Sequence, residues 1–109
     1  MNPKYKVELS IPALQDLRSI SRWIVSNDSK AKAKSLLNKL QKAMNGLSNL
    51  PSRGHALPEL ESVGFAKYLQ IHEGPYRIIY HTQDQIVYID AVLDGRRDMQ
   101  TLLSKRLIG

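Results

Sequence analysis

The alternation of apolar and polar residues first predicts a short strand and then a helix. Residues 5–9 alternate apolar and polar side chains with a period of two, as in a strand that has one face on a core. Apolar residues then recur at helical spacing from Ile11 to Val25. Ser10 offers a hydroxyl N-cap, and Pro12 falls in the first turn, where its missing N–H is tolerated. We therefore expect a helix over residues 11–25.

A second helix is predicted after the polar break at residues 26–29, which ends in a new cap. Lys34 and Lys42 point away from its apolar stripe, and Lys30 and Lys39 flank the stripe. Because the connection is short, the two helices should form an antiparallel hairpin. The stripe follows the i, i+3, i+4, i+7 pattern and comprises Ala33, Leu36, Leu37, Leu40, Met44 and Leu47.

Three β-rich segments follow an exposed loop at residues 51–58, which contains two prolines and a glycine. The segments are Phe65–Ile71, Tyr76–His81 and Ile86–Val92, and turns of hairpin length separate them, so a meander is expected. The last segment is almost continuously apolar, which predicts a central strand that is covered on both faces.

The remaining residues complete a single α+β domain. Asp98 can cap a short C-terminal helix whose apolar face contains Met99, Leu102 and Leu103. Segregated helices and strands predict a helical hairpin packed on an antiparallel sheet, which the first strand joins at an edge or at the centre. A chain of 109 residues fits one domain, residues 1–109.

Composition narrows the class of protein. Sixteen Lys and Arg residues against ten Asp and Glu residues give a net charge of +6, which favours nucleic acid or an acidic protein as the partner. No apolar segment approaches the length of a membrane span, and the first residues lack the apolar region of a secretory signal. There is no cysteine, which favours a reducing compartment, so the cytoplasm is expected.

The pattern offers little support for metal or cofactor chemistry. The three histidines are scattered, and the glycines are isolated, without a phosphate-binding loop, so we expect no functional metal and no cofactor. RNA cleavage without a metal remains open, because it needs only a base, an acid and cations around the phosphate. The residues of suitable type are His72, His81, Tyr80, Arg77 and Arg97.

Structural roles compete with these catalytic ones. Tyr76 and Tyr80 have the parity of two packing residues on one sheet face, and Arg77 would then project from the other face. His72 and His81 lie at strand ends, where a solvated or hydrogen-bonded structural role is favoured over acid–base catalysis.

The best functional candidate is the pair Arg96–Arg97 after the last strand, because strand ends present binding and reactive groups on a rigid scaffold. The alternative is a local salt bridge to Asp94 or Asp98, worth about 0.2–1 kcal/mol when exposed. Trp23 lies at the margin of the first apolar stripe, where a place at the core edge is favoured over a partner groove.

Several motifs together resemble the RelE/ParE superfamily of toxins from bacterial type II toxin–antitoxin systems. The resemblance covers almost the whole chain, and the order and spacing of the motifs carry it. They are residues 5–10 with Ala13, Asp16, Leu17 and Ile20, the loop residues Pro51, Arg53, Gly54 and 58–60, and the segments 76–80 and 92–98.

The resemblance implies a small cytoplasmic toxin with a helical hairpin on an antiparallel sheet. A co-expressed antitoxin would neutralise it by wrapping an acidic C-terminal segment around it, in a hetero-oligomer. RelE-like members cut mRNA on the ribosome, whereas ParE-like members poison DNA gyrase.

Within the superfamily, the residues favour the ParE branch. Arg97 matches the arginine after the last strand, but Leu103 occupies the position of the RelE helix tyrosine and His72 that of a second arginine. Of the lysine-rich stretch expected before the meander, only Lys67 is present. The resemblance therefore implies gyrase inhibition without turnover. Ribosome-dependent mRNA cleavage using Arg97, His72 and Arg77 is the alternative, and an inert interaction module is a third hypothesis.

The resemblance also implies site residues. Contacts to the target are expected from Arg96 and Arg97, supported by Lys105 and Arg106, and antitoxin contacts are expected from Leu14 and Trp23.

Overall fold

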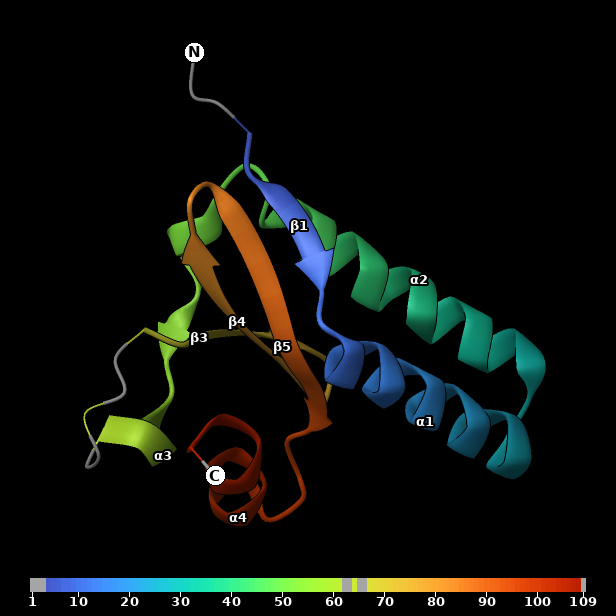
Figure 1. Ribbon diagram of the computed structural model, residues 1–109. Helices are drawn as coiled ribbons and strands as arrows, with labels where there is room; N and C mark the ends of the chain where they lie inside the picture. Colours follow the sequence, from blue (N-terminus) through green and yellow to red (C-terminus); the bar gives the residue numbers. More distant parts are fainter. Residues whose placement is uncertain (1–3, 62–63, 65–66, 109) are drawn as a thin grey trace.

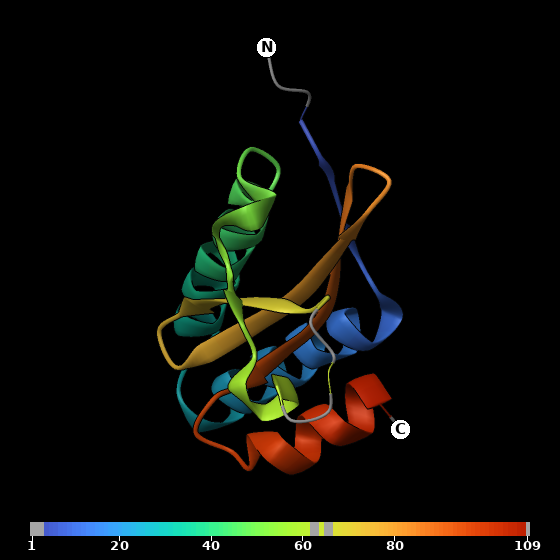
Figure 2. The ribbon, with the colours of Figure 1, turned by 90° about the vertical axis from the view of Figure 1, so that its left-hand side faces the viewer.

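The computed structural model describes residues 4–61, 64 and 67–108, and it shows one five-stranded sheet between two helical layers (Figures 1 and 2). This arrangement confirms the α+β class. The strands are β1 (Lys6–Leu9), β2 (His55–Ala56), β3 (Leu69–Glu73), β4 (Tyr76–Gln83) and β5 (Ile86–Asp94). The helices are α1 (Ile11–Asn27), α2 (Lys30–Gly46), α3 (Pro58–Glu61) and α4 (Met99–Leu103), with a 3-10 turn η1 (Pro51–Arg53) and a π-type turn η2 (Ser104–Ile108).

The longer helices begin at the residues that the sequence predicts. Ser10 Oγ accepts a hydrogen bond from Ala13 N at 3.1 Å, and Ser29 Oγ accepts one from Lys32 N at 3.1 Å. Each cap satisfies a backbone N–H of the first turn that has no partner within the helix. The helix α1 ends at Asn27 rather than at Val25.

The sheet order is β1-β5-β4-β3-β2, so β5 is an interior strand between β4 and β1, and β1 forms one edge. The hairpins β3–β4 and β4–β5 form the predicted antiparallel meander. The strand β1 pairs parallel to β5, from Lys6 opposite Ile86 to Leu9 opposite Ile89. The sheet is therefore mixed, which differs from the expected antiparallel sheet. The two parallel strands are separated in sequence by the helical hairpin and the first strands of the meander, as a crossover between parallel strands requires.

The meander strands differ in their bounds from the predicted segments. The strand β3 begins at Leu69, because this is the first residue paired with β4, where it faces Tyr80. Tyr68 is instead buried beneath α3, and residues 65–66 of the predicted segment lie outside the described residues. The strands β4 and β5 extend into a tight turn at Asp84 and Gln85, whose φ angles are 52° and 62°.

One irregularity interrupts the β4–β5 pairing. Ile79 faces Ala91 and Tyr80 faces Ile89, so Asp90 is an extra residue in β5. This β-bulge changes which residues of β5 point to each face of the sheet.

The segment predicted as an exposed loop at residues 51–58 is anchored to the sheet. Tyr80 donates its hydroxyl hydrogen to Pro51 O at 2.6 Å and accepts a hydrogen bond from Gly54 N at 3.0 Å. A Cβ atom on Gly54 would lie 2.5 Å from this hydroxyl oxygen, so only glycine allows the approach. Burial raises the pKa of Tyr80.

Each face of the sheet has its own core. The helical hairpin covers one face, where Tyr76 and Tyr80 pack as predicted, and α3 and α4 cover the other. The residues buried under the hairpin are Ala13, Leu40, Met44, Leu47, Ile71, Tyr76, Ile78, Tyr80, Val87, Ile89 and Val92. Those under α3 and α4 are Leu57, Leu60, Tyr68, Ile79, Ala91, Leu93, Met99 and Leu103. The strand β5 contributes to both cores, as its continuous apolar sequence predicts.

Within the described residues, no helix has the length and apolar character needed to cross a membrane.

Candidate functional site

The segment after β5 is a tight turn that is fixed against the neighbouring hairpin. Arg97 N donates to Asp94 O at 3.1 Å, and Gly95 N donates to Pro75 O at 2.8 Å. A Cβ atom on Gly95 would lie 3.0 Å from Cδ of Arg77 and 3.1 Å from Pro75 O. The glycine thus lets the turn rest directly on the start of β4, which gives the following arginines a rigid base.

Arg96 and Arg97 are both exposed, but they differ in whether the guanidinium has an ion-pair partner. The guanidinium of Arg96 forms two hydrogen bonds to Asp94, at 2.9 and 2.7 Å, and its side chain is 72% exposed. These bonds lower the pKa of Asp94 and raise that of Arg96. This is the local ion pair that the sequence offers as the alternative interpretation. Arg97 is exposed, and it forms no salt bridge within the part of the chain that the structure describes.

A groove of about 390 Å³ connects this arginine pair to α1. Trp23 lines the groove and is 65% exposed, so the expected place at the core edge is wrong. Trp23 is not among the residues packed in the core under the hairpin, and it shares the groove with the turn after β5. The groove is lined by Ser19, Ile20 and Trp23 of α1, Tyr76 of β4, and Asp94, Arg96 and Arg97; we call it the arginine groove.

A second groove, of about 460 Å³, lies between α1 and α2. Leu14 lines it and is 39% exposed. Near the same face of α1, Ile11 is 74% exposed, so this helix presents apolar surface at several points. Ile11 and Leu14 are one helical turn apart, so their exposed side chains lie on one face of α1. The lining residues are Leu14, Leu17, Arg18, Ser21, Arg22, Leu37 and Gln41, and we call this the hairpin groove.

Arg106 has an internal partner. Its guanidinium forms two hydrogen bonds to Asp16, both at 2.9 Å, and donates to Asp90 O at 3.1 Å. Asp16 also accepts from Val92 N at 2.9 Å. The edge strand β1 ends opposite Ile89, so this ion pair satisfies backbone groups of β5 beyond the end of β1. This geometry gives Arg106 a structural role in place of the expected support of target binding, whereas Lys105 is exposed.

Arg77 is also held internally, on the face covered by α3. Its side chain is 9% exposed and forms two hydrogen bonds to Glu59, both at 2.8 Å. Its Nε donates to Gln70, which is itself buried. The hydrogen bond from Arg77 lowers the pKa of Glu59, against the opposing effect of burial.

The three residues expected for RNA cleavage are not gathered around one groove. His72 is exposed and lies opposite Arg77 in the β3–β4 register, on the face away from the helical hairpin. Arg97 lines the arginine groove with Tyr76, whose side chain is on the hairpin face.

His81 has the hydrogen-bonded structural role that its position favours. Its Nδ1 lies 2.6 Å from Oδ2 of Asp90, and its ring stacks on Tyr88 with centroids 5.2 Å apart. Tyr68 contacts the same ring edge-on, with centroids 5.8 Å apart. Burial raises the pKa of Asp90, and the hydrogen bond from His81 opposes this effect.

The sequence predicts no site role for Ser19, Ile20, Asp16 or Glu59, whereas Trp23 is a predicted antitoxin contact. Ser19, Ile20 and Trp23 share one side of α1, so their helical spacing carries a signal for the arginine groove. Asp16 is a carboxylate three residues after the buried Ala13, which signals an internal partner. Glu59 carries no such signal, because its partner is distant in sequence.

The sequence as a whole was also compared with known proteins. The family described as the ParE toxin of type II toxin–antitoxin system, parDE, matches residues 7–99. No curated protein sequence matches the chain significantly.

Two solved structures share the fold. One is the chromosomal ParDE toxin–antitoxin system from P. aeruginosa, with a TM-score of 0.69 and 13% identity, over 84% of this chain and 96% of that chain. The other is the toxin–antitoxin complex RelBE2 from Mycobacterium tuberculosis, with a TM-score of 0.58 and 23% identity, over 86% of this chain and 94% of that chain. The family match spans both the helical hairpin and the whole meander, and this chain therefore belongs to the ParE toxin family of type II toxin–antitoxin systems.

Proposed function

We propose that this toxin inhibits DNA gyrase by binding to it, and that a cognate antitoxin neutralises the toxin in the cytoplasm. The observation that carries the proposal is the arginine pair: Arg96 and Arg97 face outward from a rigid turn, next to a groove. Two cations on a fixed turn, beside a groove that also presents Ile20, Trp23 and Tyr76, are suited to binding a large partner.

The surroundings of the other cations favour binding over RNA cleavage. Cleavage without a metal needs an acid, a base and a cation around one phosphate. Arg77 is committed to Glu59, and His72 lies on the opposite face of the sheet from the arginine groove. A binding function needs no such convergence.

The two arginines contribute to binding in different ways. Asp94 holds the guanidinium of Arg96 in one orientation before the target arrives, which reduces the entropy lost on binding. Arg97 has no salt bridge among the described residues and is available to an anionic group of the gyrase–DNA complex. The toxin makes and breaks no covalent bond in this scheme. It binds gyrase and inhibits it, and growth stops because replication fails.

The grooves beside α1 fit an acidic antitoxin segment. The lining of the hairpin groove combines leucines with Arg18 and Arg22, and that of the arginine groove combines Trp23 with Arg96 and Arg97. A segment with apolar and acidic side chains complements both, and the net charge of +6 attracts it. An antitoxin bound along α1 would cover the arginines and so block the target.

A supercoiling assay with purified gyrase, run beside a translation assay, tests the proposal. The full-length toxin should inhibit supercoiling and leave ribosome-bound mRNA intact, and the double variant Arg96→Ala/Arg97→Ala should lose the inhibition. The variant Lys4→Ala/Lys67→Ala removes two exposed positive charges elsewhere and should inhibit as the wild type does.

The contrary outcomes are distinct. Cleavage of mRNA at the ribosomal A site, without an effect on gyrase, would establish the RelE-like alternative. Normal growth on induction of the toxin would leave only the inert interaction module.

A further inference from the structure

The helix α2 carries nearly all of the excess charge of the protein. It contains five lysines and no acidic residue, in a chain whose net charge is +6. All five lysines are exposed. Lys32 pairs with Asp28 at 3.0 Å, and the other four form no salt bridge with any residue that the structure describes. Neither groove beside α1 uses these lysines, so their clustering needs another explanation.

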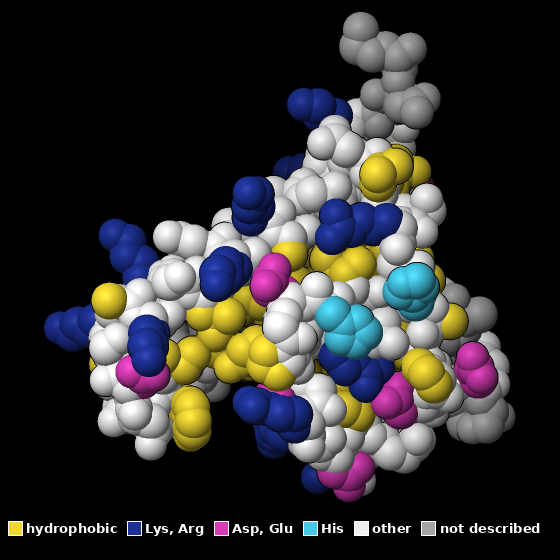
Figure 3. Space-filling model, turned by 180° about the vertical axis from the view of Figure 1, so that it is seen from behind, with side chains coloured by type: hydrophobic (Ala, Val, Ile, Leu, Met, Phe, Trp, Pro, Cys, Tyr) yellow, Lys and Arg dark blue, Asp and Glu magenta, His cyan; other side chains and the backbone are white. Residues whose placement is uncertain are grey.

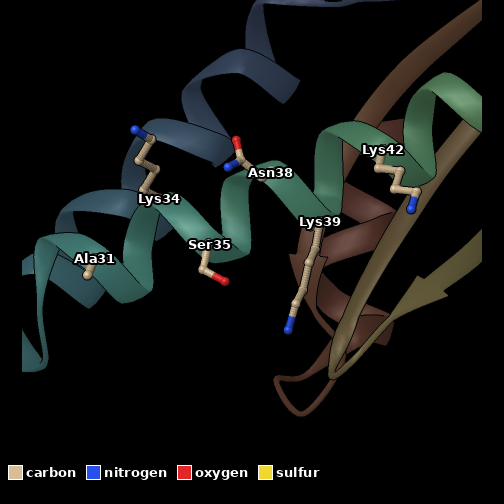
Figure 4. A pocket seen from close by; sticks show the side chains of 6 residues that line it. All are labelled: Ala31, Lys34, Ser35, Asn38, Lys39 and Lys42. Carbon is tan, nitrogen blue, oxygen red and sulfur yellow. The ribbon is translucent and has the colours of Figure 1, made fainter.

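The lysines flank a strip of small side chains on the outer side of α2. Ala31, Ser35 and Asn38 form the strip, and the side chains of Lys34 and Lys39 extend away from it in opposite directions (Figure 4). Lys42 extends from the turns that follow, about 12 Å along the helix axis from Lys34 at 1.5 Å per residue. The surface is a shallow hollow of about 470 Å³.

The divergence of the lysines indicates the shape of the ligand. A small anion needs convergent donors, and these ammonium groups point apart (Figure 4). Cations on both flanks of a helix suit a polyanion with two rows of phosphates. The major groove of B-form DNA is about 12 Å wide and admits an α-helix, whose flanking side chains reach the backbones on either side. The small strip permits this close approach.

Other nucleic acids fit less well. A single strand is usually bound on aromatic side chains, and the outer side of α2 has none. An A-form RNA duplex has a deep, narrow major groove that side chains cannot read. On the face of the molecule seen in Figure 3, several separate Lys and Arg side chains project from the surface among polar and apolar groups.

We propose that the outer face of α2 binds duplex DNA through the phosphate backbone, by means of Lys34, Lys39 and Lys42. This inference rests on the proposed function in one respect: the duplex bound by gyrase is the DNA that this face would contact during poisoning. The contact is independent of sequence, since the strip offers only short side chains to the base edges.

Fluorescence anisotropy with a labelled 30-base-pair duplex of mixed sequence tests the proposal, in the absence of gyrase and over a range of salt concentrations. The variant Lys34→Gln/Lys39→Gln/Lys42→Gln should bind on the order of 100-fold more weakly than wild type at low salt. The slope of log K against log salt should be shallower by about 0.9 for each lysine removed. The control Lys4→Gln/Lys6→Gln/Lys67→Gln loses the same charge elsewhere and should bind nearly as wild type. Unchanged melting temperatures verify that both variants are folded.

Three results would overturn the proposal: no binding by the wild type at low salt, equal binding by the α2 variant, or equal losses in the α2 variant and the control. Equal affinity for an RNA duplex would reject the major-groove geometry. If the α2 variant binds DNA normally but loses affinity for the antitoxin, the lysines serve the acidic protein instead. Because this assay contains no gyrase, its failure is independent of the supercoiling result, and an inactive supercoiling assay with intact DNA binding would reject only the proposed target.

Discussion

Two arginine–carboxylate pairs lie beside the interior strand β5 and differ mainly in their exposure to solvent. Arg106 binds Asp16 and Arg96 binds Asp94, each through two hydrogen bonds of 2.7–2.9 Å. The arginine side chain is 24% exposed in the first pair and 72% exposed in the second. The first pair completes the hydrogen bonding of β5, while the second only orients a surface group. Bond geometry is therefore the same for a partly buried arginine pair and an exposed one, and only the exposed arginine is accessible to a partner.

The largest expected effect is the loss of the internal pair. The substitution Asp16→Ala removes the partner of Arg106 and the acceptor for Val92 N. A partly buried charge and a backbone donor are then left without partners, so the protein should be destabilised by about 3–5 kcal/mol. Urea or thermal unfolding measures this loss. The matched control Asp94→Ala should retain wild-type stability, and equal destabilisation by both substitutions would remove the distinction between the two pairs.

A smaller loss is expected for the pair beneath α3. The substitution Glu59→Gln removes the negative charge opposite Arg77 but keeps an acceptor oxygen near it. Because Glu59 is partly exposed and water can approach Arg77, the cost should be about 2 kcal/mol. Thermal unfolding at neutral pH provides the measurement, and Glu61→Gln on the same short helix is the control. A stability equal to that of the wild type would show that the pair contributes nothing.

The same pair predicts a pH dependence. The pKa of Glu59 is lowered in the folded state, so its stabilising contribution is present above its ordinary value of 4.5 and is lost as the pH falls through the folded value. Stability measured from pH 7 to pH 3 should therefore fall more steeply in the wild type than in Glu59→Gln, and the difference between them should shrink as Glu59 is protonated. Parallel curves would show that Glu59 does not titrate with folding.

The smallest effect on stability is expected for the exposed pair. Arg96→Ala and Asp94→Asn should leave the melting temperature unchanged, because exposed ion pairs contribute little. Function should separate the two: Arg96→Ala weakens gyrase inhibition, whereas Asp94→Asn keeps the cation and retains most of it. Supercoiling titrations provide the measurement, and a loss of inhibition in both variants would make Asp94 itself part of the binding surface.

Local features of the fold are readable from the sequence, and distant ones are not. Ser10, Ser29 and Asp98 were predictable caps, because a cap depends on residues within one helical turn. The parallel pairing of β1 was not predictable, since apolar periodicity is the same for parallel and antiparallel neighbours. The caps are local and the strand direction is a property of the whole chain.

In the candidate site, too, features that depend on neighbours in sequence are predictable, and those that depend on distant residues are not. The exposed Arg96–Arg97 turn follows from its position after the last strand, and Asp94 is a neighbour in sequence. Arg106 and Asp16 are separated by most of the chain, so the basic C-terminal segment gives no sign that one of its cations is internal. The position of Trp23 at the margin of the apolar stripe favours the core edge over a partner groove, but helical spacing alone does not show what lies beneath that side of the helix.

The extra residue in β5 determines the side of the sheet on which the arginine turn emerges. Val87 and Ile89 point to the helical hairpin, and after Asp90 the phase of the strand is inverted, so that Val92 also points there. Asp94 is two residues after Val92, so it is on the same face of the sheet, and it lines the groove beside α1. A strand of unbroken alternation would direct the end of β5 toward α3 instead. The bulging of Asp90 thus sets the side of the sheet on which the arginines emerge: a fully paired Asp90 would turn them away from the helical hairpin, whereas deleting Asp90 would join Ile89 to Ala91 in regular alternation and keep them on that side.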